Sequence, residues 1–121
     1  MASRLQVQTL HRSQDFLRLK EKGKRIHVSQ WMLLSFSMDS STGPYFGWTI
    51  PRFVGHAVVR NKLRRWLREF FRQQLSSDSC PRELELNVVI KRYDKEFFER
   101  LSYGEFVQVL DEGWRRLRKI T

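Results

Sequence analysis

The sequence is poor in the residues that build disulfides and metal sites. Its single cysteine, Cys80, excludes an internal disulfide and a cysteine-rich zinc site. The histidines His11, His27 and His56 are scattered and lack the spacing of metal ligands. Cys80 lies in a polar turn over residues 76–81 without a base beside it, so we assign it no function. We therefore expect a chain that binds no metal or other cofactor by itself.

Long apolar runs are missing as well. A membrane-spanning helix needs about 20 predominantly apolar residues, and no segment of the sequence approaches that length. The opening segment, residues 1–6, lacks the apolar centre of a secretory signal peptide. The sequence thus predicts a cytoplasmic protein with no membrane partner.

Acidic residues are scarce relative to basic ones. The 121 residues contain 13 Asp and Glu against 23 Lys and Arg, which gives a formal net charge of +10. Such an excess repels itself in a compact chain and indicates a polyanionic partner, for which nucleic acid is the better candidate. Hydrophobic residues make up 40% of the sequence, too many for a disordered basic tail. We expect a single folded domain over residues 1–121, with flexible ends at 1–9 and 119–121.

The first half of the sequence predicts a helix followed by two strands. The helix begins near Ser13, a typical N-cap residue, and ends at Gly23. A run of β-favouring residues over 28–38, a polar connector over 39–44 and a second run over 45–50 predict an antiparallel hairpin. Apolar residues occupy both faces of the first strand, so periodicity leaves open which face is buried.

The second half predicts a long helix, a strand and two further helices. Apolar residues recur at helical spacing over 57–75, and the polar segment 76–82 ends this helix. A buried strand is expected over 84–90, followed by a short helix opening at Asp94. The last helix opens at Ser102, whose S-x-x-E pattern predicts a capping box.

This order of elements predicts the α+β class. We expect a small mixed β-sheet covered by helices in a two-layer sandwich, in the order α-β-β(-β)-α-β-α, where the strand in brackets is optional. The connection between the strands at 45–50 and 84–90 passes through the long helix. If these strands are parallel neighbours, the general rule predicts a right-handed crossover.

The long helix carries a dense group of basic side chains beside and opposite its apolar arc: Arg60, Lys62, Arg64, Arg65, Arg68 and Arg72. Like-charged pairs four residues apart each cost about 0.2–0.5 kcal/mol, and Arg65 with Glu69 is the one opposite-charge pair at that spacing. A solvated face is the alternative interpretation, but a helix made for solubility would mix signs. Because arginine contacts phosphate bidentately and stacks on bases, its dominance here favours a nucleic-acid surface.

Several segments, in order along the chain, resemble one known family. The run Arg60-Asn61-Lys62 within residues 57–72 is similar to the Arg-Asn-Arg signature helix of the bacterial ribonuclease P protein family. Other matching segments are Asp15-Phe16, Leu19 and Gly23 for its first helix, Phe46-Gly47-Trp48-Thr49-Ile50 for the strand entering the signature, and Asn87-Val88-Val89-Ile90-Lys91-Arg92 for its last strand. The family's usual Ser-Lys-Lys after the second strand is Pro51-Arg52-Phe53 here. The likeness runs from about residue 10 to residue 117.

The resemblance implies a single RNA-binding domain that assists a catalytic RNA in removing the 5′ leader of precursor tRNA. In that family the RNA subunit, with bound Mg²⁺, performs the hydrolysis, so no catalytic residue is expected in the protein. The signature helix would bind the RNA subunit through Arg60, Asn61, Lys62, Arg64, Arg65, Arg68 and Arg72. A cleft between the first helix and the sheet would hold the single-stranded leader with Phe16, Lys20, Met32, Leu34, Arg52 and Arg92. The resemblance also implies a left-handed β-α-β crossover and a protein that is monomeric without RNA.

Other interpretations stay open on the residues alone. Phe16 is at least as often an ordinary core residue as a stacking residue. Glu83 and Glu85 would share one face of a strand in a metal-dependent nuclease, although a third ligand or base is lacking. A ribosomal, other structural RNA-binding or DNA-binding module is the second rival. Against a helix-turn-helix, a strand and Pro51 precede the basic helix in place of another helix.

Overall fold

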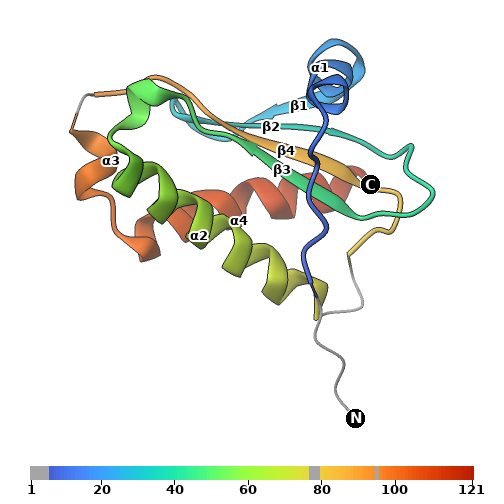
Figure 1. Ribbon diagram of the computed structural model, residues 1–121. Coiled ribbons are helices and arrows are strands. Elements are labelled where there is room, and N and C mark those ends of the chain that lie inside the picture. The colour runs from blue at the N-terminus through green and yellow to red at the C-terminus, as the bar shows by residue number, and fades with distance from the viewer. Residues whose placement is uncertain (1–5, 77–79, 95) are drawn as a thin grey trace.

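The computed structural model describes residues 6–76, 80–94 and 96–121 (Figure 1). In chain order the elements are α1 (Ser13–Lys22), β1 (Lys24–His27), β2 (Met32–Ser37), β3 (Tyr45–Thr49), the 3-10 turn η1 (Arg52–Val54), α2 (Ala57–Leu75), β4 (Glu85–Ile90), α3 (Phe97–Arg100) and α4 (Tyr103–Ile120). The predicted α+β class is confirmed. The optional third strand before the long helix is present as β1.

The strands form one mixed sheet in the order β1-β2-β4-β3. β4 runs antiparallel to β2, with Leu34 opposite Val88, and parallel to β3, with Phe46 opposite Leu86. The predicted hairpin is therefore wrong, because β4 lies between the two strands that were expected to pair. β4 is buried along nearly its whole length, which suits a strand with neighbours on both sides.

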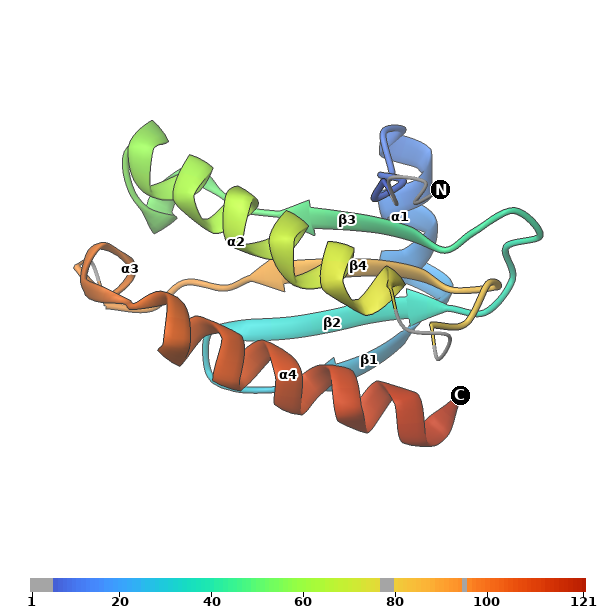
Figure 2. The ribbon, with the colours of Figure 1, turned by 90° about the horizontal axis from the view of Figure 1, so that it is seen from below.

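The β3–α2–β4 connection is a left-handed crossover. Figure 2 views the sheet from the side of α2, with β3 and β4 running in the same direction. When these strands are turned to point upward, β4 lies to the left of β3, whereas a right-handed crossover would place it to the right. The handedness implied by the resemblance is thus confirmed, and the general rule fails here.

Helices α2 and α4 cover one face of the sheet, and α1 lies on the other (Figures 1 and 2). The hydrophobic core fills the layer under α2 and α4. There Phe46 of β3 stacks on Phe71 of α2 with ring centroids 4.3 Å apart, and Phe71 meets Trp114 of α4 at 5.6 Å. The sheet face beneath α1 is left outside this core.

The last helix begins as predicted. The Glu105 amide donates to Ser102 Oγ, and the Ser102 amide donates to Glu105 Oε1, each at 3.1 Å. The hydrogen bond from the Ser102 amide lowers the pKa of the Glu105 carboxyl. The short helix α3 begins at Phe97 and not at Asp94, whose carbonyl accepts the Phe97 amide at 3.0 Å. None of the helices in the described part of the chain has the length and apolar character needed to cross a membrane.

Residues near both ends of the chain are tied to the fold. The Phe46 amide donates to the Gln8 carbonyl at 2.8 Å, and the Leu10 amide donates to the Phe46 carbonyl at 2.9 Å, so residues 8–10 follow the outer edge of β3. At the other end, Lys119 and Ile120 belong to α4. Parts of the two ends expected to be flexible thus belong to hydrogen-bonded structure. Residues 1–5 lie outside the described part.

Candidate nucleic-acid interface

A cleft of about 560 Å³ lies between α1 and the face of the sheet that points away from the core. Helix α1 and all four strands contribute its lining: Phe16, Leu17, Lys20, Arg25, His27, Leu33, Ser35, Thr49, Asn87 and Val89. These side chains are apolar, neutral polar or basic. The cleft therefore combines an apolar surface with a basic rim.

Phe16 rests on the sheet because a glycine lies beneath it. A Cβ atom at Gly47 of β3 would lie 2.8 Å from Cε1 and 2.9 Å from Cζ of the Phe16 ring. Gly47 thus leaves the space that the ring occupies, as glycine does where two parts of a chain approach closely. Phe16 is partly buried, so it both packs on β3 and lines the cleft.

Met32 and Leu34 do not line the cleft, and their assignment to it is wrong. Both side chains are 0% exposed and belong to the core. Side chains alternate between the faces of a strand, so the β2 residues in the cleft are Leu33 and Ser35. The sequence held a signal for this register, because the polar residues Ser35 and Ser37 recur at every second position and mark the face away from the core.

Two polar contacts fix α1 over the sheet. Arg18 donates to both carboxylate oxygens of Glu85 at 2.8 Å each, and also to Asp15 Oδ1 at 3.2 Å. These hydrogen bonds raise the pKa of Arg18, with that to Glu85 contributing most. Ser35 Oγ donates to the Leu19 carbonyl at 2.9 Å. The distance between α1 and the cleft floor is therefore set by directional contacts.

Lys20 lines the cleft, whereas Arg52 and Arg92 lie beyond its end. Arg52 is in η1, just after β3, and Arg92 follows β4. Because β3 and β4 are parallel, both arginines come after the carboxyl ends of these strands, next to the cleft residues Thr49 and Val89. Sequence reasoning missed most of the cleft lining: Leu17, Arg25, His27, Leu33, Ser35, Thr49, Asn87 and Val89.

The first residues of the basic group on α2 make contacts within the protein. Arg60 Nε donates to the Gly55 carbonyl at 3.2 Å. Lys62 Nζ donates to the Phe98 carbonyl of α3 at 3.1 Å and lies 5.0 Å from the ring centre of Trp66. Lys62 therefore holds α2 against α3, which is a structural role that sequence reasoning did not assign to it.

The remaining members are more accessible. Asn61, Arg65, Arg68 and Arg72 are exposed, while Arg64 is partly buried and donates to Asn61 Oδ1 at 2.7 Å. Glu69 pairs with Arg72 and not with Arg65, the partner that its spacing predicted. Within the described residues Arg65 forms no ion pair, so its charge is available to an external anion.

The comparisons with known proteins give one consistent result. The family model for ribonuclease P matches residues 6–118 of this chain. The chain belongs to the ribonuclease P protein family. The ribonuclease P protein component of Citrifermentans bemidjiense is 34% identical over 113 residues, which cover 93% of this chain and 90% of that protein. The corresponding protein of Geobacter sp. strain M21 is 37% identical over the same coverage of 93% and 90%.

Solved structures of this family have the same fold. The RNase P protein from Thermotoga maritima is 26% identical, with a TM-score of 0.71 over 94% of this chain and 97% of that one. The Staphylococcus aureus RNase P protein, at 16% identity and a TM-score of 0.72 over 90% of this chain and 94% of that one, shows the fold alone. As a ribonuclease P protein component, this chain is part of a ribonucleoprotein endoribonuclease that processes the 5′ ends of tRNA.

One of the two carboxylates that suggested a metal-dependent nuclease has another role in this family member. Both oxygens of Glu85 accept hydrogen bonds from Arg18, so Glu85 anchors α1. In residues 6–76, 80–94 and 96–121, no group of three or more His, Cys, Asp or Glu is placed to hold a metal ion.

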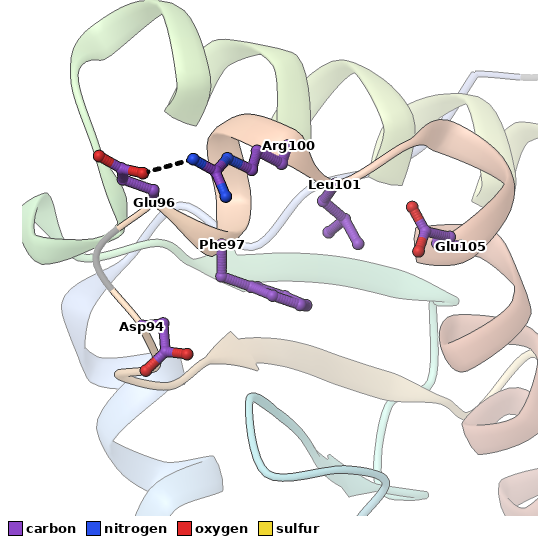
Figure 3. Close-up of a pocket in the computed structure, with 6 residues that line it drawn as sticks. All are labelled: Asp94, Glu96, Phe97, Arg100, Leu101 and Glu105. Atoms are coloured by element: carbon purple, nitrogen blue, oxygen red, sulfur yellow. Dashed lines mark hydrogen bonds and ion pairs between the residues drawn. The ribbon is translucent and has the colours of Figure 1, made fainter.

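A second hollow, of about 620 Å³, lies beside α3. Its lining is drawn in Figure 3: Asp94, Glu96, Phe97, Arg100, Leu101 and Glu105. Arg100 forms an ion pair with Glu96 at 2.8 Å, which leaves the carboxylates in excess. Like charges repel, so this hollow is a poor site for phosphate and is separate from the cleft under α1.

Proposed function

We propose that this chain binds the ribonuclease P RNA through α2 and the single-stranded 5′ leader of precursor tRNA in the cleft under α1. It would thereby support removal of the leader and formation of the mature tRNA 5′ end. The observation that carries the proposal is the composition of the cleft, in which the Phe16 ring and an apolar floor adjoin Lys20, Arg25 and His27. Single-stranded RNA favours such a combination of stacking surface and positive charge, largely independent of sequence.

The basic group on α2 supports the other half of the proposal. Arg65, Arg68 and Arg72 are exposed, and arginine contacts phosphate through paired N–H donors. Asn61 and Arg64 form a hydrogen-bonded pair beside them, and Arg60 and Lys62 hold the helix in place. We propose that the exposed arginines carry most of the phosphate contacts.

Helices α1 and α2 lie on opposite faces of the sheet (Figure 1), and the cleft lies under α1. Two RNA surfaces on opposite faces do not compete for the same ligand. The protein would therefore sit between the RNA subunit and the leader and hold both at once. Its own groups would neutralise phosphates and orient the strand.

The hydrolysis itself belongs to the RNA subunit in this proposal. Mg²⁺ would be bound by RNA and substrate, and the protein would hold no ion by itself. The isolated chain would be monomeric, and the holoenzyme would act in the cytoplasm.

A reconstitution assay tests this function. Correct 5′ cleavage of precursor tRNA by a bacterial ribonuclease P RNA is measured at low Mg²⁺ with and without the protein. We expect the protein to raise the cleavage rate and to cleave nothing when the RNA subunit is left out. No gain over RNA alone would overturn the proposal.

Two matched variants locate the RNA-subunit surface. Arg65→Ala with Arg68→Ala removes two charges from α2. Arg100→Ala with Arg115→Ala removes two charges from α3 and α4, where Arg100 pairs with the N-cap residue Glu96 and Arg115 pairs with Asp111. The first pair should weaken binding of the RNA subunit, and the second should change it little. If both pairs of changes reduced the affinity for the RNA subunit equally, binding would depend on the net charge of the protein and not on α2.

A further inference from the structure

An exposed aromatic ring and an arginine meet beyond the carboxyl ends of β3 and β4. Phe53 of η1 is 39% exposed, although it is large and apolar. The guanidinium carbon of Arg92 lies 4.4 Å from the centre of this ring, within the range of a cation–π contact. Arg92 is itself exposed, and no carboxylate of the described residues forms an ion pair with it. Both groups thus keep free surface toward solvent.

The turn that carries Phe53 is built to hold its ring outside the core. Its neighbour Val54 is 0% exposed and takes the core position. The Val54 amide donates to the Pro51 carbonyl at 3.1 Å, and Gly55 has a φ of 153°, a conformation that other residues rarely adopt. Val54 occupies the core position, and the amides of Val54 and Gly55 are hydrogen bonded within the turn. The Phe53 side chain therefore cannot turn toward the core without breaking η1.

The pair lies next to the cleft under α1. Thr49 and Val89, which line the cleft, are register partners near the ends of β3 and β4. Arg92 comes three residues after Val89, so their Cα atoms are at most about 11 Å apart. A strand that lies in the cleft and leaves it past Thr49 and Val89 would therefore meet Phe53 and Arg92 next.

We propose that Phe53 and Arg92 form a stacking site for one nucleobase of the leader, just outside the cleft. The inference rests on the leader-binding function proposed above. The base stacks on the free surface of the Phe53 ring, and Arg92 holds the ring and contacts an adjacent phosphate. Every base has a π face, so the site reads a position along the strand and not a sequence.

A scan with abasic leaders tests the site. Precursor tRNAs with a single abasic nucleotide at successive leader positions are bound to holoenzyme made with wild-type chain or with Phe53→Ala. Wild-type holoenzyme should lose about five- to 150-fold in affinity at one position beyond those held in the cleft. Holoenzyme with Phe53→Ala should bind the intact precursor with this reduced affinity. An abasic nucleotide at the same leader position should then reduce its affinity no further. Phe53→Tyr should bind as the wild type does.

Tyr103→Ala is the matched control. Tyr103 is also 39% exposed, but it lies on α4 against Trp66, on the other side of the sheet from the cleft. It should leave the abasic profile unchanged. If Phe53→Ala is unstable, Phe53→Leu keeps an apolar side chain without the ring and should show the same position-specific loss.

The outcomes separate this inference from the function it rests on. If wild-type holoenzyme binds precursor and mature tRNA equally, leader binding itself fails. If wild-type holoenzyme prefers the precursor, and holoenzyme with Phe53→Ala binds the intact and every abasic precursor as the wild type does, only the stacking site fails. A loss that is equal at all abasic positions, or that extends to mature tRNA, would assign Phe53 a structural role and overturn the site.

Discussion

Replacing Gly47 with alanine should disturb the leader cleft without removing any side chain that lines it. The added Cβ would lie 2.8 Å from Cε1 and 2.9 Å from Cζ of Phe16, and 3.1 Å from Leu10 Cδ1. Carbon atoms do not stay that close, so the Phe16 ring must turn away from β3. Because the atoms in contact are at the far end of a side chain, the ring can pivot. We expect the fold to survive with a loss of about 1–3 kcal/mol in the free energy of unfolding.

The effect on binding follows from the position of the ring. If Phe16 stacks on a leader base, moving the ring removes a contact worth about 1–3 kcal/mol, which is about five- to 150-fold in affinity for precursor tRNA. Mature tRNA lacks the leader and should bind as before. Phe16→Ala should have the same effect on precursor binding, since it removes the ring altogether.

The double variant gives the sharpest result. Once Phe16 is alanine, the Cβ of Gly47→Ala has no ring to displace, so the second change should cost little more. Contacting residues are expected to be non-additive in this way. The assay measures affinities of holoenzyme for precursor and mature tRNA and thermal unfolding of the free protein, for both single variants and the double variant.

Two outcomes would refute this account. Additive losses in precursor affinity would show that Gly47 and Phe16 act separately. Equal losses for precursor and mature tRNA, or none for either with stability reduced, would show that Phe16 is a packing residue.

Four further predictions follow from the contacts described above. Arg65→Ala with Arg68→Ala should reduce the log–log salt slope of RNA-subunit binding by about 1.4–1.8 if each arginine neutralises one phosphate; an unchanged slope places both off the RNA. Lys62→Met should lower the free energy of unfolding in urea by about 1–3 kcal/mol, because the carbonyls of α3 that it bonds lose their donor; unchanged stability would contradict that role. Glu105→Ala, which removes the carboxylate that accepts the Ser102 amide, should destabilise the protein at neutral pH. Because the Ser102 contacts lower the pKa of the Glu105 carboxyl, this difference should persist above its ordinary value of 4.5 and shrink as pH falls through the lowered pKa, and a pH-independent difference would oppose it. Burial raises the pKa of the Cys80 thiol to about 11, so its alkylation at pH 8 should be about 100-fold slower than that of a thiol with the ordinary value of 9.0, and an ordinary rate would show an accessible thiol.

Local signals in the sequence were sufficient for the helices and for the family. The apolar period over 57–75 predicted α2, and the S-x-x-E pattern at Ser102 predicted the start of α4, because both depend on residues within a few positions of one another. The basic group on α2 was accessible for the same reason, whereas the place of Phe16 in a cleft was implied by the family resemblance alone. The order of matching segments identified the family without knowledge of any long-range contact.

The pairing of strands and the identity of the cleft floor were decided by the tertiary structure. Residues 28–38 and 45–50 look like a hairpin locally, yet β4 lies between these strands, since a strand buried on both faces is better placed in the centre of the sheet. Ser35 and Ser37 mark one face of β2 as the more polar one, but Leu33 on the same face is apolar, so the sequence separates this face only weakly from that of Met32 and Leu34. A shift of one residue exchanges the faces of a strand, and only packing against α2 and α4 determines which face is buried. The cleft is therefore a property of the assembled sheet, because its lining comes from α1 and from strands that meet only in the fold.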